Sequence, residues 1–244
     1  MSSIYFGNKE IHFEIKPGKN RKRTVAIQIS PTLSVIVLTP YYLDEAKVKK
    51  IVEKKAAWIT KKQEQIKKNQ ELSPQKEFVS GESFPYLGKY YRLKISTSFA
   101  KHPESCRLVN GRFCLEIKNG SDGQGKKAAI KKALFDWYLK RAEIKINERV
   151  KHLSPQVGKW PLSIKIKNQE KRWGSCSRTG VICFNWKIVM LPISVMDYII
   201  THELCHLMYP HHSGQFWQKV QSVIPDYKIK RNWLKIHSHV TGIL

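Results

Sequence analysis

Two histidines and a glutamate near the C-terminus have the spacing of a metal-dependent hydrolase. His202, Glu203 and His206 form the pattern His-Glu-x-x-His. Residues four apart on a helix lie one turn above each other, so both imidazoles can reach one ion at about 2 Å. Glu203 is rotated by about 100° from His202, which places its carboxylate beside the ion. There it can take a proton from the attacking water and pass it to a leaving group, so the pattern predicts a hydrolase with one Zn²⁺ and Glu203 as general base.

A third ligand has to come from outside this helix, because a catalytic zinc usually has three protein ligands and one open position. Pro210 ends the helix, since the residue before a proline is pushed out of the α region. We favour His212, which lies ten residues after His202, the separation found in HExxHxxGxxH zinc proteases. Tyr209 stands where those proteases have glycine, so the turn must differ. The candidates beyond Pro210 are His211, His212, His237, His239 and Asp226.

The segment that carries the motif has the pattern of a capped helix. Ser194 is expected to cap it, with Asp197 three residues later completing a capping box. A core helix with two hydrogen-bonded histidines is the competing interpretation. We prefer the metal site because Glu203 would otherwise be a charge within an apolar stripe, and because a histidine-rich turn follows at once. The apolar stripe consists of Met196, Ile199, Ile200, Leu204 and Leu207.

A hairpin and a lysine-rich helix are expected in the N-terminal part. Residues 24–30 and 33–38 are rich in β-branched side chains and are separated by a Pro-Thr pair, which predicts two paired strands. Asp44 can cap a helix that runs to about Lys68, with its lysines facing solvent. The apolar residues that recur at helical spacing on it are Val48, Ile51, Val52, Trp58 and Ile59.

Short strands and a second long helix are expected in the middle of the chain. Asn110-Gly111 is a strong signal for a tight hairpin turn. Residues 119–125 hold three glycines with Ser and Asp and mark a candidate boundary. A helix then covers about 126–151, with an apolar face that includes Trp137 and Ile144. The expected strands cover residues 84–87, 90–95, 106–109, 113–117, 162–167 and 181–186.

These elements predict an α+β fold in two parts. An N-terminal α/β region over 1–120 would hold the hairpin, the lysine-rich helix and short strands. The catalytic region would cover 121–244, with Ser213 capping a helix after the histidine-rich turn. One continuous domain is the alternative.

The charge and composition of the chain indicate which classes of partner it can bind and where in the cell it is expected. The formal net charge of +25 should attract anions such as nucleic acid, acidic lipid or acidic protein, although a solubilising lysine-rich surface is the simpler interpretation. Five cysteines without a CxxC pair argue against a disulfide framework. No apolar run of about 18 residues predicts a membrane span, and the first residues have no signal-peptide pattern. We therefore expect a cytoplasmic protein that has no membrane partner.

The C-terminal motifs resemble those of the YgjP-like metal-dependent hydrolases, a family related to the SprT-type and WLM-type metallopeptidases. The resemblance extends over nearly the whole chain. It implies a zincin-like catalytic domain, in which a twisted antiparallel or mixed sheet covers the active-site helix and a second helix brings His212 to the metal. The family often has asparagine where this chain has His211, which leaves His211 as a competing ligand. The segments that carry the resemblance are KRWGSCS at 171–177, GVICFNW at 180–186, DYIITHELCHL at 197–207 and HSGQFW at 212–217.

The resemblance also implies that Trp173 to Cys176 lies near the metal helix, as an edge strand that aligns an extended substrate. Plain packing of Trp173 and a catalytic thiol at Cys176 are the alternatives. The function that follows is zinc-dependent peptide hydrolysis, with a peptide or protein substrate. Competing functions are a DNA-associated protease or nucleic-acid-binding protein that uses the basic surface, or a metal-dependent nucleotide or phosphate-ester hydrolase. The candidate donors to the transition-state oxyanion are Tyr198, His211 and Asn185.

Overall fold

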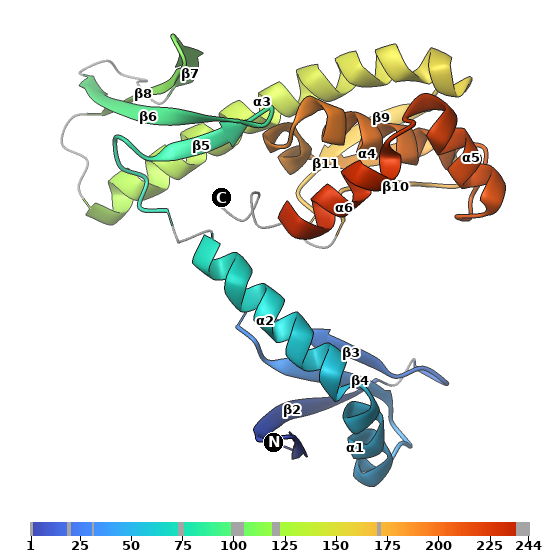
Figure 1. Ribbon diagram of the computed structural model, residues 1–244. Helices are drawn as coiled ribbons and strands as arrows, with labels where there is room; N and C mark the ends of the chain where they lie inside the picture. The colour runs from blue at the N-terminus through green and yellow to red at the C-terminus, as the bar shows by residue number, and fades with distance from the viewer. Residues whose placement is uncertain are drawn as a thin grey trace. The chain divides into compact units, whose positions relative to one another are not determined.

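The computed structural model describes residues 2–18, 21–30, 32–72, 76–98, 105–118, 123–169 and 172–237 (Figure 1). The chain divides into two compact units, Met1–Pro74 and Gln75–Leu244. Both units combine helices with a mixed sheet, which confirms the α+β class. The division expected at residues 120–121 falls within the second unit and lies outside the described residues. Within the described part, no helix has the length and apolar character needed to cross a membrane.

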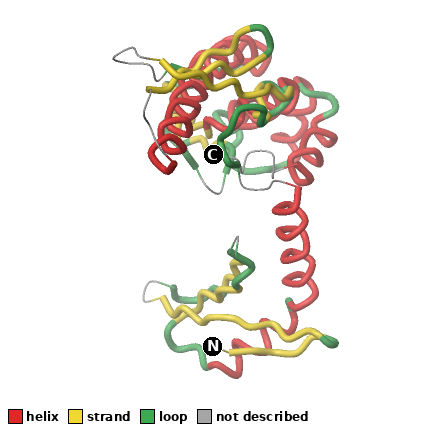
Figure 2. The backbone as a smooth tube through the Cα atoms, turned by 90° about the vertical axis from the view of Figure 1, so that its left-hand side faces the viewer, coloured by secondary structure: helices red, strands yellow, loops and turns green. Residues whose placement is uncertain are grey.

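The N-terminal unit is a four-stranded sheet covered by helix. The strand order is β1-β2-β4-β3, with β2 and β4 parallel and the other pairs antiparallel. The predicted hairpin is confirmed as the antiparallel pair β3 and β4. Figure 2 shows these strands in yellow with helical segments in red beside them. The elements are β1 Ser2–Phe6, β2 Lys9–Gly18, β3 Ala26–Ile29, β4 Val35–Pro40, α1 Glu45–Lys54 and α2 Ala56–Leu72.

Asp44 caps α1 as predicted, because its side chain accepts a hydrogen bond from the Lys47 backbone N–H at 2.8 Å. The single helix expected up to Lys68 is instead interrupted at Lys55. The prediction that Trp58 faces the core is wrong, since its side chain is 48% exposed. The buried stripe runs through Val48, Val52, Ala56 and Ile59, and Trp58 lies off that stripe.

The C-terminal unit begins with a second four-stranded sheet, in the order β5-β6-β8-β7. The four strands expected here are confirmed, and Asn110-Gly111 connects β7 and β8 with positive φ at both residues, as a tight hairpin requires. The long helix α3 starts earlier and ends later than predicted, and Ile144, placed on its apolar face, is 58% exposed. Trp137, placed on the same face, is buried as predicted, on a stripe where the Tyr138 hydroxyl donates a 2.6 Å hydrogen bond to the Pro85 carbonyl. The elements are β5 Ser83–Tyr86, β6 Lys89–Ser98, β7 Cys106–Val109, β8 Arg112–Lys118 and α3 Gly123–Val157.

A three-stranded sheet, a 3₁₀ helix and three α-helices complete the described part of this unit. The strand order is β10-β11-β9, which leaves β10 at an edge. Helix α4 contacts α3, β10, α5 and α6, and Figure 1 shows α3 running along the unit from the first sheet to the second. The elements are β9 Ser163–Lys167, β10 Gly174–Cys176, β11 Val181–Asn185, the 3₁₀ helix η1 Trp186–Met190, α4 Ile193–Cys205, α5 Gly214–Val223 and α6 Tyr227–His237.

The capping box expected at the start of α4 is wrong. The N-cap is Pro192, with no side-chain hydrogen bond, and Ser194 lies inside the helix. Asp197 instead accepts two hydrogen bonds from Arg149 of α3, at 2.7 Å from Nε and 2.8 Å from Nη2. A guanidinium fits a carboxylate in this two-bond geometry, and both side chains are mostly buried, so the pair fixes α4 against α3.

Replacing Arg149 with methionine should lower the free energy of unfolding by about 2–3 kcal/mol, because Asp197 would be left with an uncompensated charge in a mostly buried position. For a chain of this size, that corresponds to a fall in Tm of roughly 5–10 °C in a thermal melt followed by circular dichroism. Lys132→Met is the matched control, since the Lys132–Asp136 pair is exposed and such pairs contribute under about 1 kcal/mol. Equal effects of the two substitutions would contradict the structural role of Arg149.

Candidate metal centre

The end of α4 and the turn that follows position the three histidines. His202 lies in the last turn of α4, and His206 is its C-cap with helical φ and ψ, so the two rings stay one turn apart. The Tyr209 N–H still bonds to the Cys205 carbonyl at 2.9 Å, after which the chain turns through Pro210. Ser213 caps α5 as predicted, by accepting a hydrogen bond from the Phe216 N–H. This cap holds the turn so that the preceding residue, His212, meets the ring of His202.

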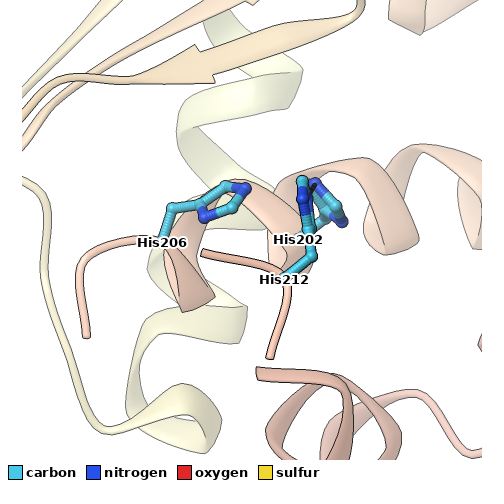
Figure 3. A group of neighbouring side chains, drawn as sticks. All are labelled: His202, His206 and His212. Atoms are coloured by element: carbon cyan, nitrogen blue, oxygen red, sulfur yellow. Dashed lines mark hydrogen bonds between the residues drawn. The ribbon is translucent and has the colours of Figure 1, made fainter. Parts of the chain in front are cut away.

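The three rings form a group that could hold one ion (Figure 3). One ligand nitrogen from each of His202, His206 and His212 lies within 4.8 Å of the others, and the Nε2 atoms of His202 and His212 are 3.1 Å apart. Ligands at about 2 Å from a tetrahedral ion lie about 3.4 Å from each other, which is close to this spacing. His206 donates a 3.0 Å hydrogen bond from Nδ1 to the Tyr209 carbonyl, which leaves its Nε2 lone pair available to a metal. The donor set therefore fits a divalent ion such as zinc.

The protonation state of these rings also suits a metal. Burial, followed by the charges of His206 and His212, lowers the pKa of His202 to about 3. Burial likewise lowers the pKa of His212, with the His206 charge as the next cause. His202 is therefore neutral at pH 7, which is the form of imidazole that binds a metal.

Glu203 is nearly buried between α4 and the edge strand β10. Its exposure is 7%. Burial raises the pKa of the Glu203 carboxyl to about 7, and the positive charge of Arg172 opposes this shift. A Cβ at Gly174 would lie 2.7 Å from the Glu203 Cγ and 2.8 Å from Oε1, so only glycine leaves room for this carboxyl group. The side chain of Glu203 is thus held against β10, and it lines the same cleft as the three histidines.

Comparison with known protein families identifies the chain. The family model described as "YgjP-like, metallopeptidase domain" matches residues 23–237. The chain belongs to the YgjP-like metallopeptidase family. The crystal structure of the metallopeptidase zymogen abylysin of Pyrococcus abyssi is 24% identical, in a match that covers 36% of this chain and 90% of that chain. Its TM-score of 0.35 is too low to establish a shared fold. A comparison with curated proteins gives no match.

Aromatic side chains of α5 and α6 support the histidines of this YgjP-like metallopeptidase. The Phe216 ring lies 4.6 to 4.9 Å from the rings of all three histidines. Trp217 stacks on His212 at 5.5 Å and on Tyr227 at 5.2 Å. His202 Nδ1 is buried without a hydrogen-bond partner in the described chain, so packing orients this ring. No role at the metal was predicted for Phe216 and Trp217, and their place one turn after His212 was the available signal.

The other histidines and the acid considered as ligands lie outside this group. His211 is exposed and lines the cleft without joining the three rings. His237 bonds to the Trp233 carbonyl within α6, and Asp226 pairs with Lys230 at 2.8 Å. His239 lies outside the described residues.

The three candidate oxyanion donors differ in their access to the cleft. Asn185 is 4% exposed, and its Nδ2 group already donates to the carbonyls of Gln169 and Arg172. Tyr198 is 5% exposed and is not among the lining residues, whereas His211 is. Of the three candidates, His211 is therefore the one that lines the cleft. Asn185 instead stabilises the segment before β10 through its side-chain hydrogen bonds.

Cys176 lines the cleft beside Glu203, but its thiol has the wrong ionisation for a nucleophile. Burial and then the Glu203 charge raise its pKa above the ordinary value for cysteine. Reactive cysteines have a lowered pKa, because the thiolate is the nucleophile. The catalytic-thiol alternative is therefore not supported.

Proposed function

We propose that this YgjP-like protein is a zinc-dependent peptidase, with one Zn²⁺ held by His202, His206 and His212 and with Glu203 as general base. The observation that carries the proposal is the meeting of three imidazoles beside a nearly buried carboxyl group, in a cleft of about 690 Å³ that all four side chains line. A cleft of this size suits a segment of peptide. The five free cysteines suit a reducing compartment, in keeping with the expected cytoplasmic location.

The roles of the protein groups follow from their positions. A zinc ion held there would polarise the substrate carbonyl and lower the pKa of the attacking water. Glu203 takes the proton from that water, because its carboxyl lies in the cleft with a pKa close to neutrality. The same carboxyl then delivers the proton to the amine of the leaving peptide. Of the three candidate oxyanion donors, His211 is the one that lines the cleft, so we assign it this role.

The edge strand β10 can hold an extended substrate beside the ion. Among the described strands it pairs with β11 alone, so its other edge can pair with a peptide. Such pairing uses main-chain hydrogen bonds and does not itself select side chains. Gly174, the first residue of β10, touches Glu203, so a peptide on this edge would pass directly by the general base.

The test is hydrolysis of casein and of a mixed peptide library by protein of measured zinc content. We expect cleavage that stops on removal of zinc by a chelator and returns when zinc is added back. Intact casein and peptides after incubation with the zinc-loaded protein would refute the proposal. Hydrolysis of a phosphodiester and binding of duplex DNA are measured in parallel as negative controls. We expect neither, because the family match supports a peptide substrate and the comparisons give no support to nucleic-acid binding.

Gly174→Ala should lower kcat/KM by about 100-fold, which is the scale of loss when a catalytic group is displaced by about 1 Å. The three atoms nearest to the added methyl group all belong to Glu203, which is not one of the proposed metal ligands, so zinc content should not change. Gly214→Ala is the matched control next to the site, since a Cβ there meets nothing within 4 Å. Unchanged kcat/KM in Gly174→Ala would show that the fit of Glu203 against β10 does not matter for activity.

A further inference from the structure

The cleft beside the three histidines carries positive charge that the described chain does not neutralise. Arg172 and Arg178 both line it, and Glu203 is the one acid among the described lining residues. The ion pairs of guanidinium groups in the described chain involve Arg107 and Arg149 instead. Both cleft arginines are exposed, so their guanidinium groups are free to meet a ligand.

Both arginines are attached to well-fixed backbone at the two ends of β10. The Arg172 carbonyl accepts a hydrogen bond from the Asn185 side chain at 3.2 Å. The carbonyl of the next residue, Trp173, accepts one from the Asn185 backbone N–H at 2.8 Å. Arg178 lies in the turn between β10 and β11, which is closed by hydrogen bonds from Ser177 to Val181 and from Gly180 to Ser177. The backbone positions from which the two side chains extend are thus set by the fold.

A peptide on the free edge of β10 would come within reach of both charges. Arg178 follows Arg172 by six positions, and strands rise by about 3.3 Å per residue, so the span is at most about 20 Å. A substrate segment of roughly six residues covers that length. Arg172 is nearest to the reacting bond, because it lies two residues from Gly174 and its charge acts on the Glu203 carboxyl.

We propose that this cleft selects peptides with carboxylate groups on either side of the cleaved bond, and that Arg172 and Arg178 are its specificity-determining residues. The inference rests on the peptidase function proposed above and adds the substrate class. A planar guanidinium can bind a carboxylate through two parallel hydrogen bonds. The net charge of +25 acts in the same direction, because a strongly basic surface speeds the approach of acidic ligands. The carboxylate can come from Asp or Glu side chains or from the C-terminus of the peptide.

The experiment compares quenched fluorescent peptides that differ only in having Glu, Gln or Lys at the flanking positions, each with a free or an amidated C-terminus. At about 50 mM salt we expect kcat/KM for the Glu peptide to exceed that for the Gln peptide about tenfold, with the Lys peptide slower still. The preference should shrink at about 500 mM salt, which screens exposed charges. A fall in kcat/KM on amidation that is the same for the Glu, Gln and Lys peptides would identify the peptide C-terminus as the carboxylate. A Glu preference that survives amidation identifies the side chains.

Arginine variants connect the preference to the two residues. Arg172→Gln should bring the Glu-to-Gln ratio of kcat/KM toward one, and Arg178→Glu should favour the Lys peptide over the Glu peptide. The matched control is Arg112→Gln, which removes the same charge from an exposed position on β8 and should leave the ratios unchanged. Zinc content and circular dichroism of each variant check the fold. Binding of the labelled Glu and Gln peptides to Glu203→Gln supplies a measure of preference that does not require cleavage.

The outcomes separate this inference from the function on which it rests. Cleavage of all three peptides at equal kcat/KM, with no effect of amidation, overturns the acidic preference and leaves the zinc peptidase standing. A preference that persists unchanged in both arginine variants overturns the assignment to Arg172 and Arg178. No cleavage of any peptide by the zinc-loaded protein, with no difference in binding between the Glu and Gln peptides, overturns both proposals.

Discussion

Glu203→Gln is expected to lose peptide hydrolysis while zinc remains bound. Glutamine has nearly the same shape, so it fits the space beside Gly174, but its amide cannot take a proton from water. We expect kcat/KM to fall by about 10²–10⁴-fold, the usual contribution of a general base. The proposed ligands, His202, His206 and His212, are unchanged, so one zinc per chain should still be found by elemental analysis.

The same variant separates a catalytic role of Glu203 from a structural one. Burial disfavours the charged carboxylate, as its raised pKa shows, so a neutral amide should not lower the Tm. Glu143→Gln is the matched control, since Glu143 is exposed on α3, and it should keep full activity. A fall in Tm with parallel loss of zinc in Glu203→Gln would indicate a structural group instead of a general base.

His212→Ala should lose zinc, whereas the neighbouring His211→Ala should keep it. Both side chains are exposed and adjacent, but only His212 brings a ring nitrogen to within 3.1 Å of the His202 Nε2 atom. Removing a residue that hydrogen-bonds to a metal ligand lowers metal affinity by about 10–100-fold, so removing a ligand itself should lower it further. Competition with a chromogenic chelator gives the zinc affinity of each variant.

The pair of variants also decides between the two histidines that the sequence left in competition. Zinc lost from His211→Ala and kept by His212→Ala would reverse the ligand assignment. A fall in kcat of His211→Ala with zinc retained would support His211 as the donor to the oxyanion, because that interaction forms only in the transition state.

Local patterns predicted much of the fold because their causes lie within a few residues. Such patterns predicted the turn at Asn110-Gly111, the helix caps at Asp44 and Ser213, and the strands of the sheet that contains β5 to β8. The errors have an equally physical origin. Trp58 and Ile144 fit a helical period but lie outside the stripes that tertiary contacts bury, and Asp197 pairs with Arg149, 48 residues away, instead of capping its own helix.

By itself, the sequence determined that His202 and His206 share one face of a helix, because the repeat of an α-helix is a local property. Tertiary structure alone decided that the turn before α5 brings His212 back to them, and that Phe216 packs on all three rings. The same holds for Gly174, which makes room for Glu203, and for the two arginines at the ends of β10. These side chains come from different helices, strands and turns, so their meeting depends on how those elements pack together.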